Sequence, residues 1–143
     1  MPKRKADARW EGSLREGRGV MRVASGAYEG PYSFQSRFQE GDGTNPEELI
    51  AGAHAGCYSM AFAADLGRAG YELESVETSA TVHLEMEPAP PTIARIDLDT
   101  RVKVSGISED EFQQIAEAAK RNCPVSRALA GVKSVNVNAE LVA

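Results

Sequence analysis

The sequence predicts an α+β fold in which curved antiparallel sheets pack around a long buried helix. Three observations lead to this prediction. Strand-like alternation appears in the first quarter of the chain and again in its second half, one long helical segment lies between them, and further helical segments precede a last strand. The chain has 143 residues, which suits a single domain spanning residues 1–143 with a sizeable core.

The first segment, about residues 6–38, is predicted to form short strands joined by glycine-rich turns. Tyr32, Phe34 and Phe38 fall on one alternating face, and the polar residues between them fall on the other. We therefore expect extended structure to continue to about Phe38, until the sequence Gly41-Asp42-Gly43 interrupts it.

A long helix is expected from about Pro46 to Ala69. Asn45 is a good N-cap, Pro46 suits the first helical position, Glu48 is placed to complete a capping box, and Gly70 suits the end of the helix. From position 49 to 64 the side chains are apolar almost all round, so we expect this helix to be buried on every face. Its small residues would let a second backbone approach closely.

The remaining segments predict a hairpin, two helices and a strand. Apolar and polar residues alternate over 76–86 and 96–104, on either side of a proline-rich turn. Ser108 opens a helix as a capping residue, and Cys123 precedes a short helical turn that ends near residue 129. Alternation over 135–141 predicts the last strand.

Composition excludes several classes of protein. The net charge of −5 argues against nucleic acid or an anionic membrane as the main partner. No apolar run reaches the ~18 residues of a membrane span, and the basic start is not followed by the apolar stretch of a signal peptide. We therefore expect a cytoplasmic protein. In that reducing compartment its two cysteines are not expected to form a permanent disulfide.

The two cysteines differ in their predicted surroundings. Cys123 lies just before Pro124, at a helix N-terminus, which favours the thiolate. Cys57 lies inside the apolar helix, where burial raises the pKa of a thiol, so it becomes a strong nucleophile only if a cation reaches it. Two inert core cysteines would fit the same pattern.

The two histidines leave further alternatives. His54 and Cys57 are three positions apart on one helix face, so His54 could act as a base, ligate zinc, or sit as a hydrogen-bonded core residue. A zinc site is disfavoured, because His83 falls on the polar face of its strand and no Cys-x-x-Cys pair is present. No metal ligand is therefore assigned.

Three blocks of sequence carry a family resemblance. They are Trp10-Glu11-Gly12, the run from Gly43-Thr44-Asn45-Pro46-Glu47-Glu48-Leu49 to His54-Ala55-Gly56-Cys57, and Asn122-Cys123-Pro124-Val125-Ser126. In this order the chain resembles the osmotically inducible protein C and organic hydroperoxide resistance (OsmC/Ohr) family over nearly its whole length. His54 and the pair Arg37-Phe38 look closer to the osmotically inducible branch.

The resemblance implies an enzyme of oxidative and osmotic stress defence. Cys57 would be the peroxidatic thiolate that reduces organic hydroperoxides and becomes a sulfenic acid, and Cys123 would resolve it as a disulfide. An arginine would stabilise the thiolate and a glutamate would orient that arginine. A dithiol, similar to the lipoyl groups of lipoylated proteins, would recycle the enzyme. No metal, flavin or other cofactor is implied. The rival reading is a thiol redox sensor or small-ligand binding protein that never turns over.

The chain offers two candidates for the arginine and two for the glutamate of this site. Arg37 matches the osmotically inducible pattern and is favoured over Arg15, which matches the other branch. Glu48 falls on the side of the helix opposite Cys57, whereas Glu47 lies about 80° from the direction of Cys57, so Glu47 is favoured.

Helix geometry then bears on the assembly. From Glu47 to Cys57 a continuous helix rises about 15 Å, so Glu47 cannot reach Cys57 of its own chain. An antiparallel crossing of two copies of this helix would bring them together. This agrees with the intertwined two-fold homodimer that the resemblance implies, with sites at the subunit interface.

Overall fold

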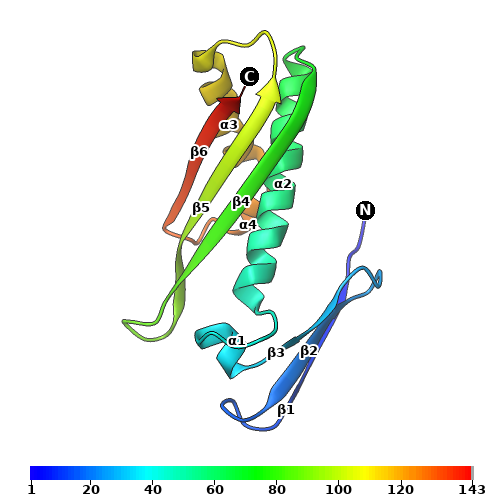
Figure 1. Cartoon of the computed structure of the whole chain (residues 1–143), viewed down its shortest axis with the longest axis vertical. Coiled ribbons are helices and arrows are strands. Elements are labelled where there is room, and N and C mark those ends of the chain that lie inside the picture. Colours follow the sequence, from blue (N-terminus) through cyan, green and yellow to red (C-terminus); the bar gives the residue numbers. More distant parts are fainter. Residues whose placement is uncertain (143) are drawn as a thin grey trace. The chain divides into compact units, whose positions relative to one another are not determined.

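The computed structural model describes residues 1–142 and has the predicted α+β composition (Figure 1). The chain divides into two compact units, Met1–Leu49 and the part from Ile50 onward. Whether residues 1–143 act as one domain stays a prediction.

The first unit contains a small antiparallel sheet. Strands β1 (Ala6–Glu11), β2 (Arg18–Val23) and β3 (Glu29–Tyr32) pair in sequence order. The turns between them use Gly12 and Gly26, whose φ angles of 92° and 80° lie in the left-handed region that glycine adopts without strain. The predicted strands of the first segment are confirmed up to Tyr32.

The prediction of extended structure to Phe38 is wrong. Residues Phe34–Phe38 form a short helix, α1. Ser33 is its N-cap: its side chain accepts from the backbone N–H of Ser36, and the Ser36 hydroxyl accepts from the N–H of Ser33. This capping box fixes a helical turn. Phe34 and Phe38 are also four positions apart, and their rings pack 5.1 Å apart on one side of the turn.

The long helix α2 (Pro46–Arg68) is confirmed close to its predicted limits. The Asn45 side chain accepts from the backbone N–H of Glu48 at 2.7 Å, as an N-cap does. The Glu48 carboxylate accepts instead from the hydroxyl of Thr44, at 2.8 Å. Gly70, with a φ of 92°, follows the helix end. None of the helices among residues 1–142 combines the length and apolar character that a membrane crossing requires.

Burial of α2 is one-sided in the single chain. Tyr58, Phe62 and Leu66 are fully buried. On the other side Gly56 is exposed and Met60 is 76% exposed. From position 52 to position 67 the exposed positions recur at helical spacing and carry small or apolar residues: Gly52, Ala53, Gly56, Met60, Ala64 and Gly67. The expectation that every face is buried is therefore not met by one chain alone. We name these six residues the open face of α2.

The second unit contains the predicted hairpin and the last strand. Strands β4 (Leu73–Glu85) and β5 (Thr92–Val104) pair antiparallel, as expected. Strand β6 (Ser134–Val142) pairs with β5 in parallel, which corrects the all-antiparallel prediction. The reason is the connection: α3 (Glu109–Asn122) and α4 (Pro124–Ala128) carry the chain back to the end where β5 begins, as a crossover between parallel strands must.

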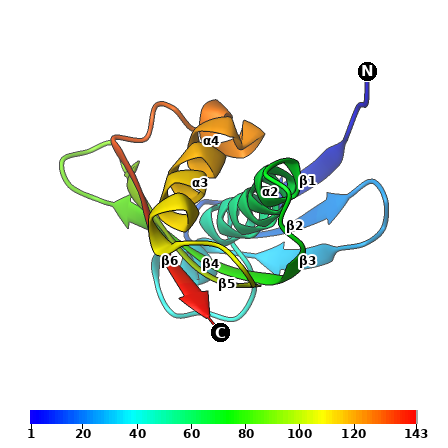
Figure 2. The ribbon, with the colours of Figure 1, turned by 90° about the horizontal axis from the view of Figure 1, so that it is seen from above.

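Helices α2 and α3 lie on the same face of the sheet β4–β5–β6 (Figures 1 and 2). The core lies between these two helices and the sheet. Within it, the Tyr58 hydroxyl donates to the carbonyl of Ala116 at 2.9 Å. Cys123 is part of this core and Cys57 packs against it. Its fully or almost fully buried members come from α2, β5 and α3: Tyr58, Phe62, Leu66, Ile96, Leu98, Val102, Phe112, Ala116 and Ala119.

Candidate active site

The two cysteines, predicted as partners, lie side by side in the second unit. Cys57 is on α2, and Cys123 is both the residue after α3 and the N-cap of α4. Both are free thiols, and their Sγ atoms are 3.0 Å apart. A disulfide needs about 2.0 Å, so an approach of roughly 1 Å would close the bond.

The two thiols differ in access. Cys123 is completely buried, whereas Cys57 is half-buried. A molecule that arrives from solvent can therefore meet Cys57 first, with Cys123 directly behind it.

The acid–base order of the pair follows from its hydrogen bonds. Burial, followed by the hydrogen bond to Cys123, raises the pKa of Cys57. Burial also acts to raise the pKa of Cys123, but hydrogen bonds with Cys57, with Ser126 and with the Val125 backbone outweigh it, so the net pKa of Cys123 is lowered. The backbone N–H of Ser126 donates to Cys123 Sγ at 3.5 Å, as an N-cap position predicts. Within one chain Cys123 is the more acidic thiol.

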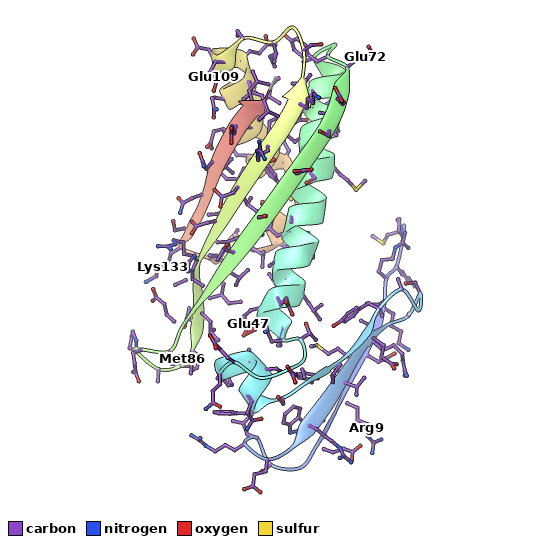
Figure 3. All side chains as sticks on the ribbon, in the orientation of Figure 1. Arg9, Glu47, Glu72, Met86, Glu109 and Lys133 are labelled. Carbon is purple, nitrogen blue, oxygen red and sulfur yellow. The ribbon has the colours of Figure 1, made fainter. Side chains whose placement is uncertain are left out.

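A second cluster of predicted residues lies in the first unit. Arg37, in α1, donates from Nε and Nη2 to the two carboxylate oxygens of Glu47, at 2.9 and 3.2 Å. Glu47 is in the first turn of α2 (Figure 3) and is buried, while the Arg37 side chain is 39% exposed. This two-point contact fixes the plane of the guanidinium and leaves part of it open for a further ligand.

Arg37 also borders an aromatic cavity. The cavity has a volume of about 220 Å³, and the guanidinium lies 5.1 Å from the centre of the Phe38 ring. An apolar wall beside a cation suits a molecule with an apolar body and a polar end. The lining residues are Trp10, Leu14, Tyr32, Ser33, Phe34, Arg37 and Phe38.

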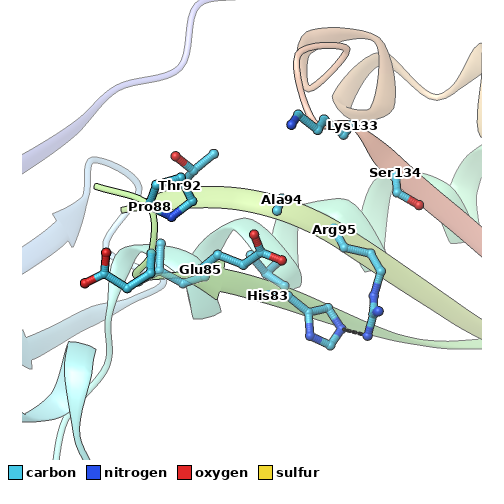
Figure 4. Close-up of a pocket in the computed structure, with 11 residues that line it drawn as sticks. His83, Glu85, Pro88, Thr92, Ala94, Arg95, Lys133 and Ser134 are labelled. Atoms are coloured by element: carbon cyan, nitrogen blue, oxygen red, sulfur yellow. Dashed lines mark hydrogen bonds between the residues drawn. The ribbon is translucent and has the colours of Figure 1, made fainter. Parts of the chain in front are cut away.

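Two other candidate residues, Arg15 and His83, make contacts of their own. The exposed Arg15 lies over the Phe34 ring at 4.8 Å. His83 is on the sheet, where its Nε2 lies 2.8 Å from Asp97 and 3.1 Å from Arg95. It borders a larger cavity of about 800 Å³ at the β4–β5 hairpin, whose lining includes neither cysteine (Figure 4). Among residues 1–142, no group of three or more His, Cys, Asp or Glu side chains is placed to hold a metal ion.

His54 contacts neither Cys57 as a base nor a metal cluster. It is fully buried, and its Nε2 lies 2.7 Å from the Ser126 hydroxyl. Sequence reasoning did not single out Ser126. The signal was its position, three residues after the capping residue Cys123, where a backbone N–H turns back toward the cap.

Comparison with known proteins decides the family. The profile of the family described as OsmC-like protein matches residues 39–138. The chain is 43% identical over 127 residues to Peroxiredoxin OsmC of Escherichia coli (strain K12), covering 88% of this chain and 89% of that protein. This chain belongs to the OsmC-like family.

Other OsmC-like proteins agree with this assignment. An organic hydroperoxide resistance protein-like 1 of Staphylococcus epidermidis is 32% identical over 104 residues, covering 72% of this chain and 74% of that protein. The crystal structure of an OsmC-like protein from Mycoplasma pneumoniae has the same fold, with a TM-score of 0.77 over 99% of each chain at 17% identity. Cys57, Cys123 and Glu47 fall within the residues matched by the OsmC-like profile, and Arg37 lies just before them.

Proposed function

We propose that this chain is a two-cysteine peroxidase that reduces organic hydroperoxides to alcohols. A peroxidase-like redox role agrees with relatives named as a peroxiredoxin and as organic hydroperoxide resistance proteins. The observation that carries the proposal is the pair of free thiols 3.0 Å apart, one half-buried and one fully buried. This arrangement suits an attacking thiol backed by a resolving thiol.

The proposed reaction has two oxidative steps. The Cys57 thiolate attacks the terminal oxygen of the hydroperoxide, the O–O bond breaks, and the alkoxide takes a proton and leaves as an alcohol. Cys57 is thereby oxidised to a sulfenic acid. The Cys123 sulfur then attacks the Cys57 sulfur, water leaves, and a Cys57–Cys123 disulfide remains.

Arg37 and Glu47 are assigned to the first step. The Arg37 guanidinium stabilises the Cys57 thiolate and the leaving oxygen, and Glu47 holds it in place. Glu47 and Cys57 lie ten positions apart on the continuous helix α2, a rise of about 15 Å. We therefore assign the ion pair to the Cys57 of a partner subunit.

The second copy required by this assignment has a surface to pack on. The open face of α2 carries glycine and alanine, and a Cβ built on Gly52 or Gly56 meets nothing within 4 Å. Small residues of this kind allow two helices to approach closely. The proposed assembly is a two-fold homodimer with two sites, each made from both chains.

The substrate class and the reductant belong to the same proposal. The aromatic cavity beside Arg37 fits the apolar part of an organic hydroperoxide better than it fits hydrogen peroxide. A dithiol, of the lipoyl type, restores the thiols by disulfide exchange. No bound cofactor takes part, and the cytoplasm, where thiols are kept reduced, is the expected location in stress defence.

Turnover tests this function. We expect purified protein to consume cumene hydroperoxide repeatedly in the presence of dihydrolipoamide. Cys57→Ser should abolish consumption, whereas Cys123→Ser should complete one turnover and hold a sulfenic acid that dimedone traps. Full activity in Cys57→Ser would show that the nucleophile is misassigned. Oxidation without repeated turnover would identify a redox sensor instead.

A further inference from the structure

A groove in the second unit carries positive charge beside an apolar surface. Its volume is about 330 Å³, and residues from α3, α4 and β6 line it. Its apolar part consists mainly of Leu129, Val132 and Val135, which pack against the core. We name the lining residues the basic groove: Lys120, Arg121, Ser126, Arg127, Leu129, Ala130, Val132 and Val135.

The carboxylates of the chain neutralise this positive charge only in part. Residues 118–139 contain four basic side chains and no acidic one, whereas the whole chain has a net charge of −5. Lys120 pairs with Glu117 at 3.0 Å, just outside this stretch. Arg121 and Arg127 are exposed and form no ion pair among residues 1–142. Two guanidinium groups are therefore free to bind carboxylates of a partner.

The basic groove adjoins the two thiols. Ser126 is one of its lining residues, and the backbone N–H of Ser126 donates to Cys123 Sγ at 3.5 Å. Cys123 Sγ in turn lies 3.0 Å from Sγ of the half-buried Cys57. A partner bound in this groove is therefore close to the disulfide that the proposed reaction forms.

We propose that the basic groove docks the protein that reduces the Cys57–Cys123 disulfide, a partner with an acidic surface and a dithiol on a flexible arm. The inference rests on the proposed peroxidase function and names the surface used in its recycling step. Cys123 is fully buried and Cys57 is half-buried, so the sulfurs are open to a slender arm but not to the surface of a folded protein. Docking raises the local concentration of the dithiol at the end of that arm.

The basic groove suits a protein better than it suits nucleic acid. Proteins that bind duplex DNA typically contact about 6–10 phosphates. The groove supplies three cations, and one of them is already paired with Glu117. Its apolar part beside exposed charge is typical of a protein interface, which has an apolar centre and a polar rim. The proposed reaction also requires a reductant at the thiol pair in every turnover.

The recycling step balances in electrons and protons. One thiolate of the dithiol attacks the accessible Cys57 sulfur, the S–S bond breaks, and Cys123 leaves as a thiolate that the Ser126 N–H stabilises. The second thiol of the dithiol then attacks the mixed disulfide and releases Cys57. Two electrons and two protons have passed to the two cysteines, and the dithiol has become a disulfide.

Turnover of cumene hydroperoxide with two matched peptides tests the docking surface. One synthetic peptide carries a reduced lipoyl-lysine among glutamates, and the other has glutamine in place of each glutamate. At low ionic strength we expect kcat/KM of the wild type to be about 10-fold higher for the glutamate peptide, because opposite charges speed association. The double variant Arg121→Glu, Arg127→Glu should lose this preference. About 0.5 M NaCl should remove most of it from the wild type, because salt screens exposed charges.

Two controls separate docking from chemistry. Free dihydrolipoamide is uncharged, so wild type and double variant should use it with rates within about 2-fold of each other. Arg101→Glu makes the same charge change at an exposed position of β5 and should keep the wild-type preference for the glutamate peptide.

Several outcomes would overturn the docking surface. Equal kcat/KM of the wild type for the two peptides would do so, and so would an equal loss of preference in Arg101→Glu, which indicates a general effect of charge. A double variant that is also slow with free dihydrolipoamide would show that the substitutions act on the thiols. Binding of a short DNA duplex that the double variant abolishes, with no preference between the peptides, would assign the groove to nucleic acid.

Folding and the proposed function are checked separately. If circular dichroism shows that the double variant is unfolded, Arg121→Gln and Arg127→Gln replace it, and each should reduce the preference about 3-fold. Wild-type protein that consumes no hydroperoxide with free dihydrolipoamide would overturn the proposed function. Failure of docking alone is distinct, because turnover with free dihydrolipoamide then continues.

Discussion

At the scale of single residues, the pKa values of Cys57 and Cys123 lie in the opposite order from the one that the proposed reaction requires. The proposed peroxidase reaction requires a thiolate at Cys57, yet within one chain the pKa of Cys57 is raised and that of Cys123 is lowered. The contradiction disappears if a guanidinium reaches Cys57, because a nearby cation favours the thiolate. The proposed reaction therefore depends on Arg37 as much as on the Cys57 sulfur.

Replacing Arg37 by alanine tests this point. We expect the first-turnover reaction of Arg37→Ala with cumene hydroperoxide to slow about 100-fold at pH 7, because the thiolate loses its cation. Burial leaves the pKa of Cys57 raised, so the residual rate should climb about tenfold per pH unit until that pKa is passed. Stopped-flow measurements of peroxide loss between pH 6 and about 10 give both quantities.

Arg15→Ala is the matched control for this variant. The Arg15 guanidinium lies over Phe34 on the exposed surface, so peroxide consumption should stay within about 2-fold of wild type. A large loss in Arg15→Ala with none in Arg37→Ala would transfer the role to Arg15.

At the scale of elements, α1 differs from its prediction, because Phe34–Phe38 is helical and not extended. Alternation of Tyr32, Phe34 and Phe38 indicated a strand, but aromatic residues four apart fit a helical turn equally well. Ser36 decides between them. Its hydroxyl accepts within the capping box and donates to the carbonyl of Thr44 at 2.7 Å, which ties α1 to the chain just before α2. That contact places Arg37 beside Glu47.

Ser36→Ala should loosen this connection. We expect the variant to lose about 1–3 kcal/mol of unfolding free energy, because a buried hydroxyl is removed and the Thr44 carbonyl is left unpaired. Urea unfolding measures this loss. Peroxidase activity should fall too, since Arg37 lies in the same turn. Ser79→Ala, at an exposed position of β4, should unfold like wild type. Unchanged stability in Ser36→Ala would contradict the role of α1 as the anchor of Arg37.

The open face of α2 gives the second prediction at this scale. Gly56→Leu adds a large side chain where a Cβ meets nothing within 4 Å, so the single chain should still fold. If a second copy packs there, however, the variant should sediment as a monomer and lose peroxidase activity. Circular dichroism checks the fold, and Gln114→Leu on the exposed side of α3 is the control. A fully active Gly56→Leu dimer would place the interface elsewhere.

At the scale of the whole molecule, the working unit is proposed to be larger than one chain. Each chain carries a thiol half, Cys57 with Cys123, and an ionic half, Arg37 with Glu47. The continuous helix α2 separates Glu47 from Cys57 of the same chain by about 15 Å of rise. Two copies would then make two sites, each with one half from either chain.

Complementation between two inactive variants tests the shared site. Cys57→Ser supplies only the ionic half, and Arg37→Ala supplies only an intact thiol half. When the two are co-refolded in equal amounts, random pairing should restore about a quarter of the wild-type sites. Each variant refolded alone should stay nearly inactive. Absence of any recovery in mixed dimers, verified by affinity tags on both chains, would show that each site is built within one chain.

Residues that are neighbours in the sequence determined the limits of the long helix, the hairpin and the family of this protein. The limits of α2 follow from Asn45 and Gly70, the hairpin follows from alternation, and the motifs around Cys57 and Cys123 determine the family. These features depend on residues that are neighbours in sequence, so propensity, capping and spacing are enough to predict them.

Tertiary structure alone decided the rest. The parallel pairing of β6, the contact of Ser36 with Thr44 that ties α1 to the start of α2, and the contact of His54 with Ser126 depend on hydrogen bonds or packing that periodicity does not encode. The 3.0 Å separation of the sulfurs joins residues 66 positions apart, and only the packing of α2 against the end of α3 brings them together. The sequence named both cysteines, and the folded core decided that one is accessible and the other buried behind it.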